Sequence, residues 1–199
     1  MVRHGETVEN RNGTVQGQIP GKLTELGIKQ AKLVGERLKN HVFDIIYSSD
    51  LQRVVDTTKE IAVHHPNVEI IYDKRLREWS RGIYEGGTRD KLRKAINDSG
   101  LDFVEFKPKG GESVKEMHTR VNDFINYLKE KEQGKKVLIV THGGFVTLSH
   151  LTFKNEDYEK RRDYHPKNTA VSEIEYLGEG KFKINILNCT NHLDESDLT

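Results

Sequence analysis

The stretch Val137-Leu138-Ile139-Val140-Thr141-His142-Gly143-Gly144 decides the predicted fold. Its first five residues form an almost wholly apolar run, which is typical of a strand buried on both faces of a parallel sheet. His142 follows the strand directly, and the two glycines allow the chain to turn into a helix. Because open α/β sheets bind ligands at the carboxyl ends of their strands, we expect a binding site at His142 and Gly143.

The segments before and after this strand alternate between helical and strand-like patterns, which favours an α/β architecture. Helices are predicted from the cap at Thr24, over 51–62, and from the capping box of Ser113 and Glu116 to Gly134. Further strands are predicted over 44–47, 69–72, 170–176 and 181–187, the last two joined as a hairpin. The polar stretch 9–22 is predicted to be a loop, and the acidic residues from His192 onward are predicted to fray.

A second candidate site opens the chain, where Arg3 and His4 precede Gly5. Arginine offers a planar fork of donors that suits phosphate oxygens, and a neutral histidine can act as a nucleophile. Glycine lets the backbone approach a ligand closely. Most such tripeptides are basic surface residues beside a turn, so the functional interpretation depends on partners elsewhere in the chain. Only Met1 and Val2 precede it, so we expect either a very short first strand or a natural start before Met1.

Several further fragments supply such partners, and together they resemble the histidine phosphatase superfamily, which includes the cofactor-dependent phosphoglycerate mutases. The fragments run in the order that the family shows and extend from Arg3 to Gly144. They are Arg3-His4-Gly5-Glu6-Thr7 with Asn10, Leu23-Thr24 with Gly27, Gln30 and Ala31, Ser48-Ser49-Asp50-Leu51-Gln52-Arg53, Leu76-Arg77-Glu78, Gly82 with Glu85-Gly86, Gly111-Glu112-Ser113 and Val140-Thr141-His142-Gly143-Gly144. The patterns and the resemblance predict a three-layer α/β fold, with a mostly parallel central sheet and helices on both faces, as in phosphoglycerate mutases.

The resemblance implies a role for each of five catalytic residues. His4 would be the nucleophile and would form a phosphohistidine, while Arg3, Arg53 and His142 would surround the phosphate oxygens. Glu78 would protonate the leaving oxygen and then activate water, with Glu6 and Glu85 as alternatives for that role. Phosphate or substrate binding is predicted for Arg3, Asn10, Gln16, Gly17, Arg53, Arg81 and Gly143, although Gln16 also fits an ordinary polar loop.

The region after Glu78 departs from the family pattern. Tyr84-Glu85-Gly86 has tyrosine where phosphatase-like members usually have tryptophan, and Arg81 places a charge where an aromatic or apolar residue is common. The polar, helix-prone stretch 88–109 predicts a small cap, which we place around 80–112 within a single domain spanning 1–199. A short cap favours hydrolysis, because mutases usually have a longer one with paired basic residues.

The amino-acid composition limits which binding partners we expect. Lys plus Arg, 32, nearly balances Asp plus Glu, 31, so no strong overall charge predicts binding to nucleic acid or membrane. The single Cys189 excludes an intrachain disulfide and, without a membrane span or secretion signal, favours a cytoplasmic location. The remaining histidines lack metal-ligand spacing and are predicted to be structural or on the surface: His41, His64, His65, His118, His150, His165 and His192. No metal and no cofactor are predicted, and a homodimer is left open.

Three functions remain after this reading. The favoured one is a phosphomonoesterase that hydrolyses small phosphorylated metabolites through a phosphohistidine. The alternative is a cofactor-dependent phosphoglycerate mutase, which shares that intermediate. A non-catalytic module that binds phosphorylated ligands is disfavoured, because such a module would be expected to lack His4, Glu78 or His142, and the chain has all three.

Overall fold

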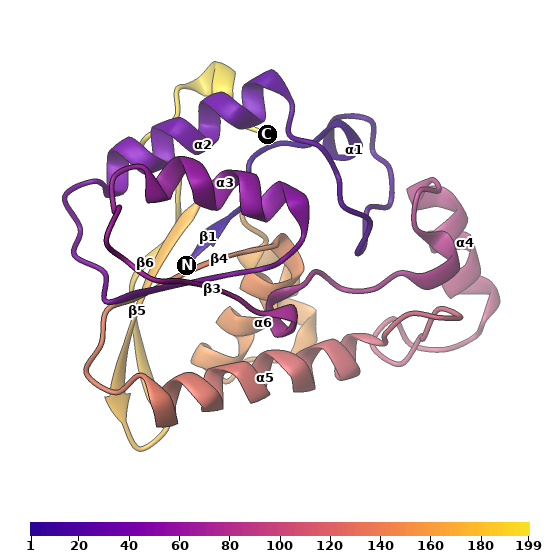
Figure 1. Cartoon of the computed structure of the whole chain (residues 1–199). Helices are drawn as coiled ribbons and strands as arrows, with labels where there is room; N and C mark the ends of the chain where they lie inside the picture. The colour runs from indigo at the N-terminus through magenta and orange to yellow at the C-terminus, as the bar shows by residue number, and fades with distance from the viewer.

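A computed structural model describes residues 1–199, and a six-stranded sheet lies at its centre (Figure 1). The strands are β1 (Val2–Arg3), β2 (Ile45–Ser48), β3 (Ile70–Tyr72), β4 (Val137–Thr141), β5 (Val171–Gly178) and β6 (Lys181–Cys189). They lie in the order β3-β2-β4-β1-β5-β6. The first four in this order are parallel, whereas β5 and β6 form the predicted antiparallel hairpin. The prediction of a mostly parallel central sheet is therefore confirmed.

Six α-helices connect or flank the strands: α1 (Val8–Arg11), α2 (Glu25–Leu38), α3 (Gln52–Ala62), α4 (Arg89–Asp98), α5 (Val114–Lys131) and α6 (Gly143–Lys154). Short 3-10 helices add η1 (Lys74–Leu76), η2 (Gly82–Tyr84), η3 (Tyr158–Tyr164) and η4 (Glu195–Asp197). The predicted caps are present, because the Thr24 hydroxyl accepts from the Gly27 N–H at 2.9 Å and Ser113 forms a capping box with Glu116. The helix α1 interrupts a stretch that was predicted to be only loop.

The helices form a layer on each face of the sheet (Figure 1). Successive side chains of a strand point to opposite faces, so the strands divide their apolar residues between two cores. Ile46 and Leu138 pack in a cluster with residues of α2 and α3. Tyr47 and Ile139 pack in a separate cluster with residues of α5 and α6. This division confirms the predicted three layers.

The segment 80–112 contains α4, which lies away from the sheet on the side of α1 (Figure 1). A small core of its own joins Leu92 and Phe106 to Val15 of the loop after α1. A backbone bridge between Thr14 and Thr88 adds a second connection to that loop. The segment is therefore attached to the loop between α1 and α2, and α1 itself lies shortly after Arg3-His4-Gly5.

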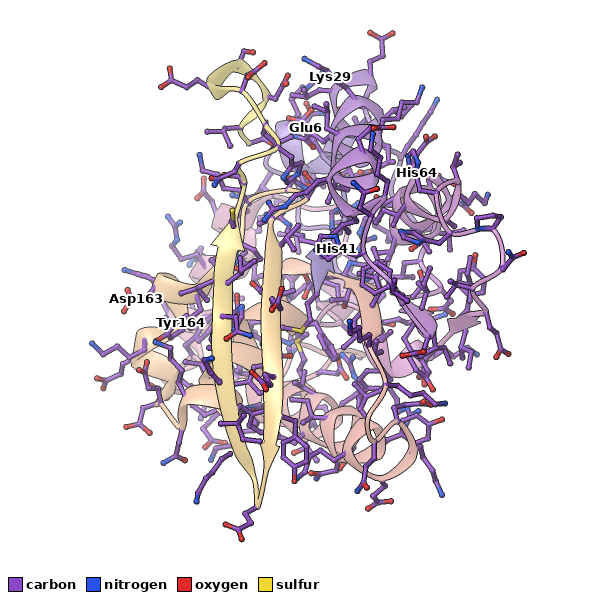
Figure 2. All side chains as sticks on the ribbon, turned by 90° about the vertical axis from the view of Figure 1, so that its left-hand side faces the viewer. Glu6, Lys29, His41, His64, Asp163 and Tyr164 are labelled. Carbon is purple, nitrogen blue, oxygen red and sulfur yellow. The ribbon has the colours of Figure 1, made fainter.

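The end of the chain is packed rather than frayed, so that expectation was wrong. Asp197 is 3% exposed, and its carboxylate lies 2.8 Å from Lys29 Nζ. Gln30 Nε2 donates to the Asp197 carbonyl at 2.7 Å and to the Thr199 hydroxyl at 3.1 Å. Figure 2 shows Lys29 beside this last segment, with Glu6 nearby. Fraying was predicted from acidic composition alone, which does not reveal the partners that α2 supplies.

None of the helices combines the length and the apolarity that a bilayer crossing requires.

Candidate active site

The register between β1 and β4 places His4 beside His142. Val2 pairs with Val140 and Arg3 with Thr141 in this parallel pair. The next residue of each strand is a histidine, and the His4 backbone N–H donates to the Thr141 carbonyl at 3.0 Å. The two imidazole centroids are 5.3 Å apart, with the rings edge to face. Two motifs that are far apart in the sequence therefore meet at the carboxyl edge of the sheet, as predicted for ligand binding.

The His4 ring has a defined tautomer. Its Nδ1 lies 2.7 Å from the Gly5 carbonyl oxygen, which can only accept, so Nδ1 carries the hydrogen. Burial, together with the nearby Arg53 and Arg3 guanidiniums, holds the pKa of His4 well below its usual value. The ring is therefore neutral near pH 7. Its Nε2 has a lone pair, which is the requirement for a nucleophile.

His142 is fully buried at the first turn of α6. Its Nε2 lies 2.8 Å from the Ser49 hydroxyl, while its Nδ1 is buried without a hydrogen-bond partner in the chain. Burial and then Arg53 hold its pKa well below the usual value as well. The role of Ser49 was not predicted, although Ser49 lies in one of the fragments that resemble the family.

Arg3 and Arg53 are held by backbone carbonyls and take part in no ion pair. Arg3 Nη1 donates to Pro166 O at 2.6 Å, and Arg53 donates to Ile19 O at 2.6 Å and to Gly17 O at 2.8 Å. The Nε of each is buried without a partner. Burial lowers the pKa of both guanidiniums to about 10, so each remains charged at neutral pH. Two positive charges without an ion-pair partner, one buried on Arg53 and one partly buried on Arg3, make an environment that favours an anion.

Glu78 lies in the loop that follows η1. Its two carboxylate oxygens accept from the backbone N–H of Trp79 at 2.8 Å and of Gly144 at 3.1 Å. A Cβ at Gly144 would collide with this carboxylate, so a larger residue there would displace the Glu78 side chain. Glu78 is thus held against the first turn of α6, the helix that begins directly after His142.

The three predicted residues between β1 and α2 differ in their surroundings. Asn10 lines the cavity described below, and its Oδ1 accepts from the Thr7 N–H at 3.3 Å. Gln16 is bonded to the side chains of Thr7 and Glu9, which matches the alternative of an ordinary polar loop residue. Gly17 has a φ of +52° and contributes the carbonyl that accepts from Arg53.

Arg81 stacks on an aromatic ring. The carbon at the centre of its guanidinium is 3.2 Å from the centroid of the Trp79 ring, and its backbone N–H donates to Glu85 at 2.8 Å. Burial lowers the pKa of Arg81 to about 10, against the opposing effect of Glu78. Arg81 therefore lies in the field of the Glu78 carboxylate but does not line the cavity beside Arg3.

A cavity of about 280 Å³ opens beside Arg3 and contains no hydrophobic lining residue. It is lined by Arg3, Glu6, Asn10, Arg89, His165, Pro166, Lys167, Asn168 and Thr199. Sequence reasoning missed its residues in α4 and in the loop before β5. The Asn168 side chain donates to the His4 carbonyl at 2.9 Å, which ties that loop to the strand end. A polar Asn at 168 gives no sequence signal for such a contact. Across the structure, no group of three His, Cys, Asp or Glu side chains is arranged to hold a metal ion.

Comparisons with known proteins agree with this geometry. A family profile described as the histidine phosphatase superfamily (branch 1) matches residues 1–190. Phosphoglycerate mutase-like protein 4 of Arabidopsis thaliana is 31% identical over 98% of this chain and 86% of its own. Phosphoserine phosphatase 1 of Hydrogenobacter thermophilus is also 31% identical, over 98% of this chain and 93% of its own. The chain therefore belongs to the histidine phosphatase superfamily.

Solved structures show the same fold. The alpha-ribazole phosphatase of Shigella flexneri superposes with a TM-score of 0.85, at 26% identity and with 94% of each chain covered. The relatives thus include both phosphatases and phosphoglycerate mutase-like proteins, which confirms the predicted class of enzyme.

Proposed function

We propose that the protein is a phosphomonoesterase that hydrolyses small phosphorylated metabolites through a phosphohistidine at His4. One observation carries the proposal. Three buried nitrogens that have no partner in the chain belong to the residues around His4: Arg3 Nε, Arg53 Nε and His142 Nδ1. A buried polar atom without a partner is costly, and the oxygens of a phosphoryl group would satisfy all three.

The reaction proceeds in two displacements. The lone pair of His4 Nε2 attacks phosphorus, the bond to the leaving oxygen breaks, and the protonated Glu78 gives that oxygen a proton. Glu78, now a carboxylate, then takes a proton from water as the water oxygen attacks phosphorus, and the bond from phosphorus to His4 breaks. Arg3, Arg53 and His142 stabilise the charge on the other oxygens in both steps, with no metal proposed.

Glu78 is a better candidate for the acid than the two alternatives. The Glu6 carboxylate is bonded to Arg11 at 2.7 Å and to Thr24 at 2.7 Å. Glu85 accepts from the backbone N–H groups of Gln18 and Arg81 and so braces the loop instead. Glu78 alone of the three is held against α6 next to His142.

A phosphoglycerate mutase remains the second candidate, because a mutase-like protein is among the relatives of this chain. A mutase returns the phosphoryl group to a second substrate oxygen instead of water. Two activities should therefore be measured in one EDTA-treated preparation, with and without a bisphosphoglycerate primer. They are the release of inorganic phosphate and the movement of the phosphoryl group between the oxygens of phosphoglycerate. We expect phosphate release to dominate. Dominant interconversion would promote the mutase, and loss of activity on chelation would overturn the metal-free scheme.

His4 itself is tested by trapping. Brief exposure to a substrate labelled in the phosphoryl group, followed by alkaline quenching and mass spectrometry, should place the label on His4. His4→Gln should remove the label and lower turnover by at least about a thousandfold. Near-normal turnover of the variant would refute the assignment. A protein that bound substrate without turnover would instead be the non-catalytic module.

We also propose a cytoplasmic location and leave a homodimer as an alternative to a monomer. The location is supported by the one cysteine, Cys189, which is free. The sheet ends in the edge strand β6, and exposed strand edges can pair with a second copy. Sedimentation velocity over a range of concentrations would measure the oligomeric state.

A further inference from the structure

We infer that the substrate carries a second anionic group, a carboxylate or a second phosphate, which Arg89 and Lys167 bind in the cavity beside Arg3. The inference rests on the proposed function and gives it a substrate class. The two residues come from different parts of the chain, Arg89 from the first turn of α4 and Lys167 from the loop before β5. Neither was a candidate from the sequence.

Arg3 belongs both to the proposed phosphate site and to the lining of the cavity. One guanidinium nitrogen of Arg3 is bonded to Pro166, and the buried Nε has no partner in the chain. Arg3 thus touches both the phosphoryl-transfer site and the wall that carries Lys167. A volume of about 280 Å³ is at the lower end for small-molecule sites, which suits a metabolite of a few carbon atoms.

The side chains that line the cavity have an excess of positive charge. Arg89 and Lys167 take part in no ion pair and make no side-chain hydrogen bond, so their donors are available to a ligand. The only acidic side chain in the lining is Glu6, whose carboxylate is already paired with Arg11 at 2.7 Å. The lining therefore offers an anionic group two cations, Arg89 and Lys167, that have no ion-pair partner in the chain.

The remaining wall offers neutral donors. A Cβ at Gly143 would lie 3.0 Å from the His165 ring and 3.4 Å from Arg3 Nε, so His165 packs close to the phosphate site. Burial, followed by Arg3, lowers the pKa of His165, which keeps the ring neutral at pH 7 with one N–H to donate. Asn168 is fixed from both ends, donating to the His4 carbonyl and accepting from the Thr199 hydroxyl at 3.2 Å.

The cavity has no apolar lining residue, which distinguishes it from a site that binds the uncharged part of a substrate. Small-molecule sites are mostly apolar, with a few placed polar groups. Here every lining residue except Pro166 has a polar or charged side chain. Arg81, which the sequence suggested for phosphate or substrate binding, instead stacks on Trp79 outside the cavity lining.

The test uses substrate pairs that differ only in the second anion. 3-Phosphoglycerate and glycerol 3-phosphate differ by a carboxylate, while fructose 1,6-bisphosphate and fructose 6-phosphate differ by a phosphate. For the wild type we expect at least one pair to favour the second anion in kcat/KM. Arg89→Gln and Lys167→Gln should each lower that preference about tenfold, the loss of one charge-assisted hydrogen bond. Arg93→Gln, on the exposed surface of α4 and paired only with Asp90, should leave it unchanged.

The substrate pair whose preference in kcat/KM falls in Arg89→Gln and Lys167→Gln shows whether the site binds a carboxylate or a phosphate. The inference is overturned if the wild type prefers the singly charged member of both pairs, or if Arg89→Gln and Lys167→Gln leave both preferences unchanged. Calorimetric titration of His4→Gln with the same four compounds separates this from the proposed function, since it measures binding without turnover. Tighter binding of a doubly charged member, weakened by adding Arg89→Gln, would support the site even if the protein hydrolysed none of them.

Discussion

Arg120 of α5 forms a forked ion pair with Glu112, its Nε and Nη2 donating to the two carboxylate oxygens at 2.9 Å and 2.8 Å. The third nitrogen of the fork donates to the carbonyls of Arg75 and Arg77, both at 2.8 Å. Glu112 in turn accepts from the Ser80 N–H at 3.0 Å. The pair therefore fixes the backbone on either side of Glu78 without touching its carboxylate.

The first prediction follows from these hydrogen bonds, through which Arg120 is a positioning residue for Glu78. Arg120→Lys keeps the charge but loses the fork. We expect it to lower kcat about tenfold for an alkyl phosphate, which needs the acid, and less for nitrophenyl phosphate. Lys131→Met, an exposed change on the same helix, is the control. Equal losses on both substrates in fully folded Arg120→Lys would show that Arg120 only supports the fold.

The second prediction concerns Glu78 itself. Glu78→Gln keeps the size of the side chain and an acceptor oxygen for one of the two backbone N–H groups, but it cannot give or take a proton. The expected loss of kcat is about 100- to 10,000-fold for an alkyl phosphate, the usual contribution of general acid–base catalysis. Nitrophenyl phosphate should lose much less in the step that forms the phosphohistidine, measured as the burst of nitrophenol. Equal losses in that step would move the acid role to Glu6 or Glu85.

The third prediction follows from the lowered pKa of His4. Because burial and two guanidiniums disfavour the imidazolium, His4 should remain neutral, with hydrogen on Nδ1, as the pH falls below 6.5. Ring ¹⁵N chemical shifts, assigned by comparison with His4→Gln, would report this directly from pH 8 to pH 5. Uptake of a proton centred near pH 6.5 would contradict the structure.

The fourth prediction concerns stability and the buried His150, which lies 3.0 Å from the Ser172 hydroxyl. Burial lowers its pKa from 6.5 to about 4, so between these values the unfolded chain binds a proton that the folded chain does not. The free energy of unfolding should therefore fall as the pH falls from 6.5 to 4, on the order of 3 kcal/mol from this group alone.

Urea unfolding at several pH values would measure this loss. His150→Gln should reduce the dependence on pH by up to one proton, whereas the exposed His41→Gln should not. An unchanged slope for His150→Gln would mean that other groups account for acid sensitivity.

The elements that the sequence predicted best are those whose signals are local. The apolar run of β4 and the caps at Thr24 and Ser113 are read from a few neighbouring residues, and the structure has them. The same holds for His4 and His142, since each directly follows a strand and parallel strands align their carboxyl ends. The family profile and the superposed structures confirm the family and the fold. The catalytic roles of individual residues remain predictions.

The features that the sequence did not predict depend on contacts between distant segments. His165 was assigned to the surface or to a structural role, yet it lines the cavity because the loop before β5 returns to β1. Asn168 belongs to no sequence motif, and its link to the site is the hydrogen bond that its side chain donates to the His4 carbonyl. Similarly, Asp197 is buried with Lys29 as its ion-pair partner, and the acidic composition of the chain end does not reveal that partner.

The hydrogen bond from Arg3 to Pro166 joins residues that are 163 positions apart in the sequence. The ribosome therefore makes its two ends at different times. His4 is synthesised well before the loop that holds its neighbour Arg3. At about 5–20 residues per second, roughly ten seconds or more separate the two. A nascent chain stalled before the loop is complete would therefore carry His4 without this support for Arg3. Catalytic activity should appear only after the loop that contains Pro166 has left the ribosome.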